Sequence, residues 1–331
     1  NGDTNIEINN ITQDSRNISN NSLFVCIKGY TVDGHNYISQ AIKNGAKVIL
    51  IEKDIDYSPY KDISFIKVFS TEKAAEIIAP FFYDYPSHKL RMIGITGTNG
   101  KTTTSYLIRN ILIAKRHKVG LMGTIENIIE NEKNEAKNTT PEVIEFQKTL
   151  AKMVDKKVKY AVTEVSSHAL KLNRIAGSEY DVAVFTNITR DHLDFHLTFD
   201  DYLKSKTLLF SSLTNENNVK KNKTAIINLD DPNKDAILNV TKSKIITYST
   251  KTDADIKAGN IKINSLGTSF SLTTPLNKRP VTLNLKITGL FNVYNVLAAI
   301  GATIVEGIDL DTIIKSLESF NSIDGRFELI N

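Results

Sequence analysis

Short apolar runs and helical spacings alternate along the chain and predict an α/β protein. Near the amino terminus, apolar runs at 23–27 and 47–52 predict buried strands, and the spacing over 36–44 predicts a helix between them. Gly45 follows as a capping glycine. Strand, helix and strand in this order favour a parallel pair, so we expect a small α/β unit.

A larger unit is predicted after the turn-rich linker at 84–88. We therefore expect one domain over 1–88 and a second, mostly parallel-sheet domain over 89–331. Thr198, with Asp201 three residues later, predicts a helix start in which each side chain satisfies a backbone donor. The strands of the second domain are expected at 91–96, 160–165, 181–188, 224–229 and, by strict alternation, 281–287, and its helices at 102–114, 199–212 and 292–306.

Composition restricts the class of protein. A length of 331 residues suggests about two domains, and 41% hydrophobic residues are enough to bury a core. The net charge of +4 is small and unclustered, so it gives no case for nucleic acid or a membrane surface. The single cysteine, Cys26, excludes an internal disulfide and a thiolate zinc site. With no apolar run of about 18 residues and no signal peptide, we expect a cytoplasmic protein.

The strongest local signal is the run TGTNGKT at 96–102, between a predicted strand and a predicted helix. Glycines let backbone amides converge on phosphate, and the helix adds its positive end. Lys101 would neutralise phosphates and Thr102 would ligate Mg²⁺. The usual nucleotide pattern has glycine where Ile95 stands, so this loop is a shorter variant. The alternative interpretation is a glycine-rich turn with an exposed lysine.

Polar side chains lie at the carboxyl ends of two of the predicted strands, where ligands collect in parallel sheets. Glu164 could hold a metal ion, and Asn187 precedes a segment that contains His192 and His196. Each histidine alone is more often an ordinary loop residue. Lys206, on the helix at 199–212, is by spacing alone a solvent-facing lysine.

A serine hydrolase is not supported. The run Ser166-Ser167-His168 suggests nucleophilic catalysis. However, no orienting acid is evident and the nucleophile-elbow pattern G-x-S-x-G is absent.

Taken together, the motifs resemble those of the Mur ligases. The resemblance spans nearly the whole chain and is strongest to the branch that extends UDP-N-acetylmuramoyl-dipeptide. The motifs that carry it are TQDSR at 12–16, DGH at 33–35, TGTNGKTTT at 96–104, NTTP at 138–141, EVSSHAL at 164–170 and TNITRDHLDFH at 186–196.

The resemblance implies an ATP-dependent ligase of peptidoglycan precursor synthesis, working as a monomer with Mg²⁺. A substrate carboxylate would attack the γ-phosphate of ATP, and an amino acid would then displace phosphate from the acyl phosphate. Its partners would be UDP-N-acetylmuramoyl-dipeptide, ATP and an amino acid.

The family's functional residues carry over by motif. Those implied for ATP are Gly97, Thr98, Asn99, Gly100, Lys101, Thr102, Thr103, Asn292 and Arg326. Those implied for the nucleotide-sugar peptide are Asn138, Thr139, Thr140, Ser166 and Arg174, with Ser15, Tyr30 and Thr31 at the uridine diphosphate end. Those implied for catalysis or metal are Lys101, Thr102, Glu164, His192 and Lys206, the last as a carbamate.

Two departures from the family pattern matter. Leu172 stands where the family often has a substrate-binding glutamine. The family also has a third, carboxyl-terminal domain that binds the amino acid. We expect this domain to be absent here, so the sequence does not identify the amino acid, and we expect the chain alone to be inactive. The alternatives are a dipeptide-adding or folylpolyglutamate-type ligase, or a nucleotide-sugar binding module without catalysis.

Overall fold

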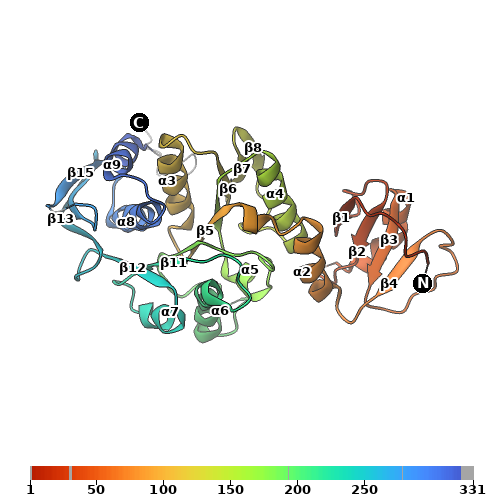
Figure 1. The fold of residues 1–331 in the computed structure, drawn as a ribbon. Coiled ribbons are helices and arrows are strands. Elements are labelled where there is room, and N and C mark those ends of the chain that lie inside the picture. Colours follow the sequence, from red (N-terminus) through yellow and green to blue (C-terminus); the bar gives the residue numbers. More distant parts are fainter. Residues whose placement is uncertain (1, 30–31, 193, 278, 322–331) are drawn as a thin grey trace. The chain divides into compact units, whose positions relative to one another are not determined.

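The structure, a computed structural model, describes residues 2–29, 32–192, 194–277 and 279–321 (Figure 1). It divides into two compact units. The first comprises Asn1–Pro86, Pro141–Ala151 and Asn173–Ser178, and the second comprises Ser87–Thr140, Lys152–Leu172 and Glu179–Asn331. The sequence predicted a single boundary near residue 88. The two additional segments join the first unit because Val143, Ile144 and Ala176 are buried in its hydrophobic core.

The first unit contains a parallel sheet in the order β1-β2-β3-β4. The predicted parallel pair is confirmed, since Phe24 of β2 pairs with Ile49 of β3. The predicted helix begins earlier than expected, as a 3-10 turn at Gly34–Tyr37, because Asp33 accepts a hydrogen bond from the backbone amide of His35. The other elements are β1 (Asn10–Thr12), β2 (Ser22–Val25), α1 (Ile38–Lys43), β3 (Ala46–Ile51), β4 (Ser64–Lys67) and α2 (Thr71–Phe82). Helix α4 (Val143–Asp155) begins in this unit.

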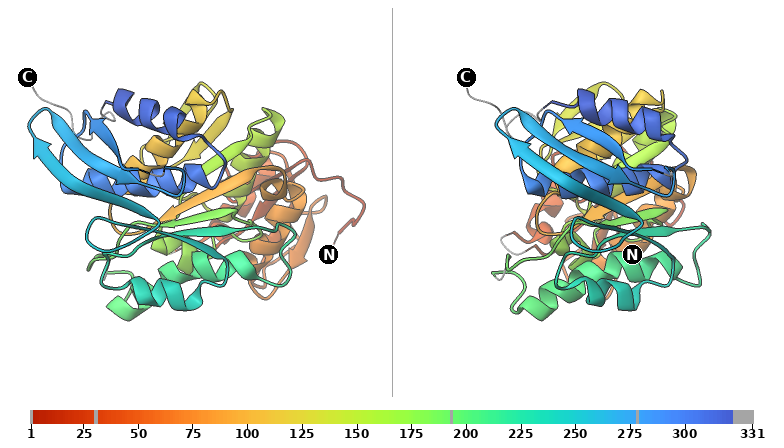
Figure 2. Two further views of the ribbon diagram at one scale, coloured as in Figure 1. Left: turned by 60° about the vertical axis from the view of Figure 1, so that its left-hand side comes forward. Right: turned by 90° about the vertical axis from the view of Figure 1, so that its left-hand side faces the viewer.

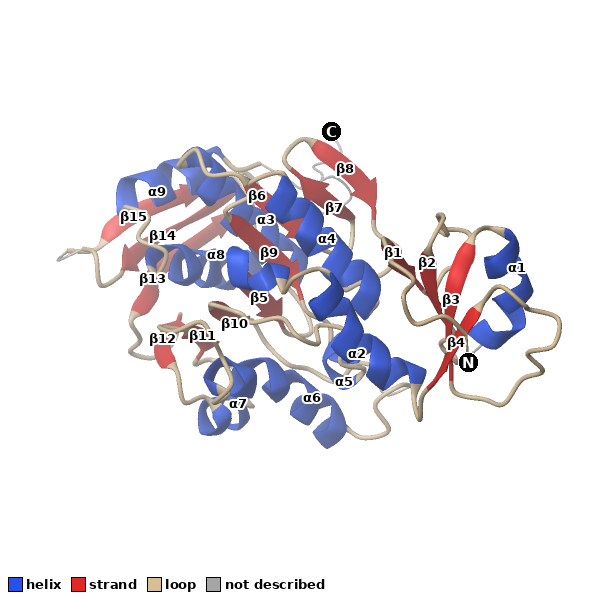
Figure 3. Ribbon diagram, turned by 45° about the vertical axis from the view of Figure 1, so that its right-hand side comes forward, coloured by secondary structure: helices blue, strands red, loops and turns tan. Residues whose placement is uncertain are grey.

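The second unit is built on a sheet in the order β15-β14-β13-β12-β11-β10-β5-β9-β6-β7-β8 (Figures 1 and 3). The strands from β13 to β6 in this order are parallel, and β14, β15, β7 and β8 pair antiparallel. The predicted strands are confirmed, including the alternating one, now β15. The strands are β5 (Arg91–Thr96), β6 (Val119–Met122), β7 (Glu126–Ile129), β8 (Glu132–Glu135), β9 (Tyr160–Glu164), β10 (Val182–Phe185), β11 (Thr224–Asn228), β12 (Lys244–Ser249), β13 (Ile256–Asn264), β14 (Gly267–Thr273) and β15 (Val281–Leu285).

Helices cover both faces of this sheet (Figure 2). Helices α3 and α8 pack together on one face, and their apolar side chains form the main core with β5, β9, β10 and β11. Helix α6 contacts β5, and α7 contacts β11. The helices of this unit are α3 (Lys101–Ala114), α5 (Ser167–Lys171), α6 (Phe199–Ser211), α7 (Lys234–Val240), α8 (Leu290–Ile304) and α9 (Leu310–Ser319), with 3-10 turns at Pro86–Lys89 and Ser212–Thr214.

Helix α6 starts as predicted, with one difference. The hydroxyl of Thr198 accepts a hydrogen bond from the backbone amide of Asp201 at 3.1 Å. The carboxylate of Asp201 does not serve as the expected second half of this cap. It accepts hydrogen bonds from the side chains of Lys171 and His196 instead, and the bond from Lys171 links α6 to α5.

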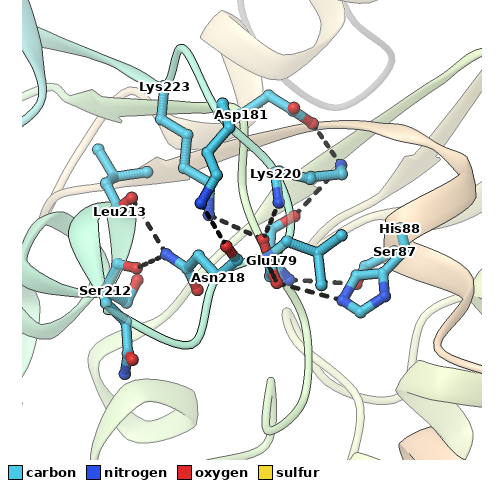
Figure 4. A network of polar contacts seen from close by, with 12 residues as sticks. Ser87, His88, Glu179, Asp181, Ser212, Leu213, Asn218, Lys220 and Lys223 are labelled. Atoms are coloured by element: carbon cyan, nitrogen blue, oxygen red, sulfur yellow. Dashed lines mark hydrogen bonds and ion pairs between the residues drawn. The ribbon is translucent and has the colours of Figure 1, made fainter.

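A group of largely buried ion pairs lies at the amino-terminal ends of β10 and β11 (Figure 4). Lys220 lies 2.5 Å from Asp181, and Lys223 lies 3.0 Å from Glu179. His88 approaches the other carboxylate oxygen of Glu179 at 3.2 Å. This end of the strands is opposite the glycine-rich loop at 96–102, called the phosphate loop below, so these ion pairs contribute to the stability of the fold.

Within the described ranges, no helix combines the length and the apolar character that crossing a bilayer requires.

Candidate active site

The phosphate loop follows β5 and opens α3, as the sequence predicted. Two glycines give it its shape. Gly97 has φ of 151° and Gly100 has φ of 86°, conformations that side chains rarely adopt. A Cβ atom on Gly97 would lie 1.9 Å from the Thr186 hydroxyl, and one on Gly100 would lie 2.2 Å from the amide oxygen of Asn295. Both positions therefore require glycine for close approach as well as for backbone conformation.

The loop is held by the segment after β10. The side chain of Asn187 accepts a hydrogen bond from the Asn99 amide and donates one to the Asn99 carbonyl, both at 3.0 Å. The backbone carbonyl of Asn187 also accepts from the Thr98 amide at 2.8 Å. After β5 the chain crosses through α3 to β6 on one side of the sheet, whereas after β10, the neighbour of β5, it goes on through α6 to β11 on the other side. The loop thus occupies the topological switch point, where parallel sheets bind ligands.

Lys101 is the first residue of α3. Its ammonium group donates to the carbonyl oxygens of Gly97 at 2.9 Å and Thr98 at 2.8 Å. This places a positive charge over the loop, beside the amino-terminal end of the helix. Such an arrangement is suited to an anionic phosphate.

Glu164, the last residue of β9, is fully buried. Its carboxylate accepts hydrogen bonds from the Thr102 hydroxyl at 3.0 Å, the Thr124 hydroxyl at 2.9 Å and the Thr124 amide at 3.1 Å. These donors are neutral, and a buried carboxylate is costly without a compensating positive charge. Gly123 allows this approach, since a Cβ atom there would lie 2.3 Å from the carboxylate.

Three of the residues implied for the nucleotide-sugar peptide lie around Glu164. The Thr139 hydroxyl is 3.1 Å from that of Thr124. The Thr140 hydroxyl donates to the Glu164 carbonyl at 2.8 Å and accepts from the Ser166 amide at 3.1 Å. One hydrogen-bonded chain therefore runs from the phosphate loop to this segment.

Lys206 is buried, with only 1% of its surface exposed. Its nitrogen donates to the Gly97 carbonyl at 2.8 Å and lies 4.5 Å from the centre of the Tyr202 ring. Burial lowers the pKa of Lys206 well below its ordinary value of 10.5, and the charge of Lys101 lowers it further, while Asp191 opposes the shift. The spacing had left Lys206 as a solvent-facing lysine. The structure instead directs it inward to the phosphate loop.

His192 lies in the segment between β10 and α6, with φ of 53°. Its side chain is 45% exposed, and its ring centre is 5.0 Å from that of His168. In the described part of the chain, no group of three or more His, Cys, Asp or Glu side chains is arranged to hold a metal ion. Mg²⁺ is commonly held by one or two carboxylates, with substrate phosphates and water completing its shell. Buried Glu164 beside the Thr102 hydroxyl fits that pattern.

A cavity of about 560 Å³ opens beside the loop, a size typical of small-ligand sites. Asn292, implied for ATP, is fully buried and donates to the Thr288 carbonyl. Asn295, one turn later on α8, lines the cavity, and sequence reasoning missed it. The lining residues are Asn99, Gly100, Thr103, Asn187, Asn228, Asp230, Asp231, Pro232, Lys251, Phe291, Tyr294 and Asn295.

Asp230 is a further cavity residue that the sequence did not single out. Burial would raise its pKa, but hydrogen bonds from Ser249, Thr250 and Tyr294 outweigh this and lower it. The carboxylate is thus held ionised at the cavity wall. The turn Asp230-Asp231-Pro232 after β11 was the available signal, because β11 is another parallel strand whose carboxyl end faces the same edge.

The other implied residues lie elsewhere. In the first unit, the Ser15 carbonyl accepts from Asn44 at 2.7 Å, and Arg174 pairs with Glu142 at 2.6 Å. In the second, Asn138 is exposed and Leu172 directly follows α5 as its carboxyl-terminal cap residue. Tyr30, Thr31 and Arg326 lie outside the described residues.

Known proteins with similar sequences carry the names of amino-acid ligases. The chain is 46% identical over 327 residues to the UDP-N-acetylmuramoyl-L-alanyl-D-glutamate--2,6-diaminopimelate ligase of Bacillus cereus, covering 99% of this chain and 65% of that protein. The identically named ligase of Clostridium botulinum is 46% identical over 325 residues, covering 98% and 65%. The chain therefore spans about two thirds of the length of these relatives.

Two solved structures resemble this chain over most of its length. A structure with that same ligase name superposes with a TM-score of 0.81 at 26% identity, over 98% of this chain and 65% of that one. MurF from Acinetobacter baumannii gives a TM-score of 0.74 at 23% identity over 98% and 65%, a likeness of fold alone.

Two family domains match in order along the chain. Residues 7–83 match the catalytic domain of the Mur ligase family, and residues 95–303 match the Mur ligase middle domain, which contains the phosphate loop, Glu164 and Lys206. The chain belongs to the Mur ligase family.

Proposed function

We propose that the protein carrying this chain is an ATP-dependent ligase of peptidoglycan precursor synthesis. It joins an amino acid to the D-glutamate carboxyl group of UDP-N-acetylmuramoyl-L-alanyl-D-glutamate. The amino acid to test first is 2,6-diaminopimelate, which the relatives carry in their names. The domain over 1–88 takes the uridine diphosphate, the domain over 89–331 takes ATP, and the protein acts as a cytoplasmic monomer.

The observation that carries this proposal is the hydrogen-bonded chain from Thr102 through Glu164 and Thr124 to Thr139. Thr102 belongs to the phosphate loop, and Thr139 belongs to the segment implied for the peptide. A ligase that phosphorylates a carboxylate must bring these two substrates together. A nucleotidase or a simple sugar-nucleotide binder has no need for this link.

The reaction has two steps. A carboxylate oxygen of the substrate forms a bond to the γ-phosphorus of ATP, and the bond to the ADP oxygen breaks. The amine nitrogen of the amino acid then attacks the acyl carbon, inorganic phosphate leaves, and the nitrogen loses a proton. The protein contributes mainly placement and charge neutralisation. Lys101 and the loop amides hold the phosphates, and Thr139, Thr140 and Ser166 hold the peptide end.

Mg²⁺ would be held by Glu164 and Thr102, with His192 and a carbamate on Lys206 as further candidates. When bound, it would neutralise phosphate charge. Carbamate formation requires a neutral amine, whose nitrogen bonds to the carbon of CO₂ with release of one proton. Burial lowers the pKa of Lys206, which favours that neutral amine. The modification would place an anion beside the phosphate loop.

The test is phosphate release by the full-length protein with ATP and Mg²⁺. We expect release only when UDP-N-acetylmuramoyl-L-alanyl-D-glutamate and diaminopimelate are both present. Lysine in place of diaminopimelate is the matched control for the amino acid. Release that needs no nucleotide-sugar peptide would overturn the proposal. Tight binding of that peptide without any amino-acid-dependent release would favour the non-catalytic binding module.

A further inference from the structure

A polar chain links α5 to α6, and it is buried at Ser167 and His196 but 34% exposed at the Asp201 side chain. The ring of His196 is fully buried, and both of its nitrogens have partners. Nε2 lies 2.9 Å from the Ser167 hydroxyl, and Nδ1 lies 3.3 Å from the Asp201 carboxylate. This is the order of groups in a serine hydrolase. However, Ser167 is only 1% exposed and cannot meet a substrate, so the chain is not a nucleophilic site.

The partners assign the protons. A carboxylate at Asp201 only accepts hydrogen bonds, so Nδ1 of His196 carries the proton. Nε2 then accepts from the Ser167 hydroxyl. The ion pair between Asp201 and Lys171 fixes the far end of the chain. Both nitrogens of the buried His196 ring are therefore satisfied, and a satisfied buried polar group favours one arrangement of the elements that it joins.

Those elements carry groups that the proposed function requires. Ser167 directly follows Ser166, and Asp201 lies on the helix that carries Lys206. The backbone amide of His196 donates to the His192 carbonyl at 2.9 Å, which links the two residues through the main chain. The ring packs 5.2 Å from Tyr202, whose hydroxyl is 2.8 Å from that of Thr98 in the phosphate loop.

We propose that His196 is a positioning residue, which fixes Ser166 on the peptide side relative to Lys206 and the phosphate loop. The proposal rests on the proposed function. Transfer between two substrates depends on their alignment, and misplacement by about 1 Å can cost about a hundredfold in rate. Loss of the His196 link should therefore slow the transfer step more than it weakens the binding of either substrate.

The first test needs no activity. Amide hydrogen exchange is measured on chain 1–331 for wild type, His196→Leu, His196→Gln and the control Ser211→Ala, an exposed residue at the end of α6. We expect amides at 167–171 and 194–198 to exchange about tenfold faster or more in His196→Leu, with β5 and α3 unchanged. Unchanged exchange would overturn the positioning role. If His196→Leu does not fold, Ser167→Ala removes one end of the chain and carries the same expectation.

The second test is kinetic, in the full-length protein. His196→Leu should lower kcat by about tenfold to a hundredfold while the KM values for ATP and the nucleotide-sugar change less than about threefold. His196→Gln, which can still accept from Ser167, should recover part of kcat. A raised KM with kcat retained, or no difference between the two variants, would overturn the proposal. If His196→Leu shows the expected faster exchange but the full-length wild type has no turnover, only the proposed function is overturned.

Discussion

The side-chain nitrogen of Lys206 lies 2.8 Å from the carbonyl oxygen of Gly97, so a lysine of α6 reaches the first glycine of the phosphate loop. Only 1% of the lysine is exposed. Within the described ranges no carboxylate bonds directly to Lys206, and a buried lysine without such a partner is destabilising when charged. Its position beside a phosphate-binding loop therefore points to a chemical role.

We expect Lys206 to carry a carbamate. With ¹³C-bicarbonate, chain 1–331 should show a carbamate resonance that is absent in Lys206→Ala and retained in Lys204→Ala, an exposed lysine of the same helix. In the full-length protein, a short-chain carboxylate should restore part of the activity that Lys206→Ala loses. A crystal structure with an unmodified, solvent-facing amine at saturating bicarbonate would contradict this.

Lys101→Ala should abolish ATP-dependent activity without unfolding the protein. The lost charge at the phosphate site should cost about 3–4 kcal/mol of transition-state stabilisation, or more than about a hundredfold in kcat/KM. The measurement is phosphate release together with a melting curve. Lys115→Ala, at the end of α3 in an exposed pair with Asp309, is the control. Wild-type turnover by Lys101→Ala is incompatible with the assigned role of the loop.

Gly123→Ala should weaken Mg²⁺-dependent nucleotide binding. The new methyl group would lie 2.3 Å from a Glu164 oxygen, so the carboxylate must shift from the position in which it accepts from Thr102 and Thr124. We expect calorimetry to show weaker ATP binding with Mg²⁺ than in wild type, and little difference with EDTA. Gly259→Ala is the matched control, because its nearest neighbour is 3.1 Å away, on Ser271. Equal losses with and without Mg²⁺ would argue against Glu164 as a metal ligand.

The ion pairs and hydrogen bonds of Glu179 should make the stability of the fold depend on pH. Burial would raise the pKa of Glu179, but amide donors from Val219 and Lys220 and the ion pair with Lys223 outweigh it and lower the pKa below its ordinary 4.5. The stabilisation is therefore fully present above about pH 4.5 and is lost as pH falls through the folded-state pKa.

Melting temperatures of wild type and Glu179→Gln between about pH 3 and 7 measure this effect. The wild type should be the more stable at neutral pH, and the difference should shrink in acid. A difference that stays constant across the range would show that the carboxylate does not titrate as described.

Chain 1–331 should bind the nucleotide-sugar peptide but hardly turn over. The motifs from Ser15 to Arg174 supply most of the residues implied for that ligand, whereas residues 1–331 match only 65% of the length of the related ligase. Closure of a mobile element normally excludes water from such a site. Without that closure, the acyl phosphate would be open to water and would hydrolyse. Calorimetric titration should show tight nucleotide-sugar binding and weak ATP binding. Full ligase turnover by residues 1–331 would show that this reasoning is wrong.

The sequence by itself determined the local framework. Strand β5 has the bounds that its apolar run predicted, and the glycines of 97–100 mark the loop because few other residues tolerate those backbone conformations. Thr198 identified the start of α6 for a similarly local reason, a hydroxyl within reach of a free amide. Motif order also identified the family, which no single spacing could do.

Only the tertiary structure decided which side chains meet. Lys206 has the spacing of a surface lysine, and it is buried because the loop 109 residues earlier in the chain packs against its helix. Asn295 lines the cavity, whereas Asn292, one turn earlier on α8, is fully buried and bonds to the Thr288 carbonyl and to Asn295. The link from Ser167 through His196 to Asp201 joins segments whose separation in the sequence carries no signal. Burial and hydrogen-bond partners depend on long-range packing, which a local pattern of residues does not encode.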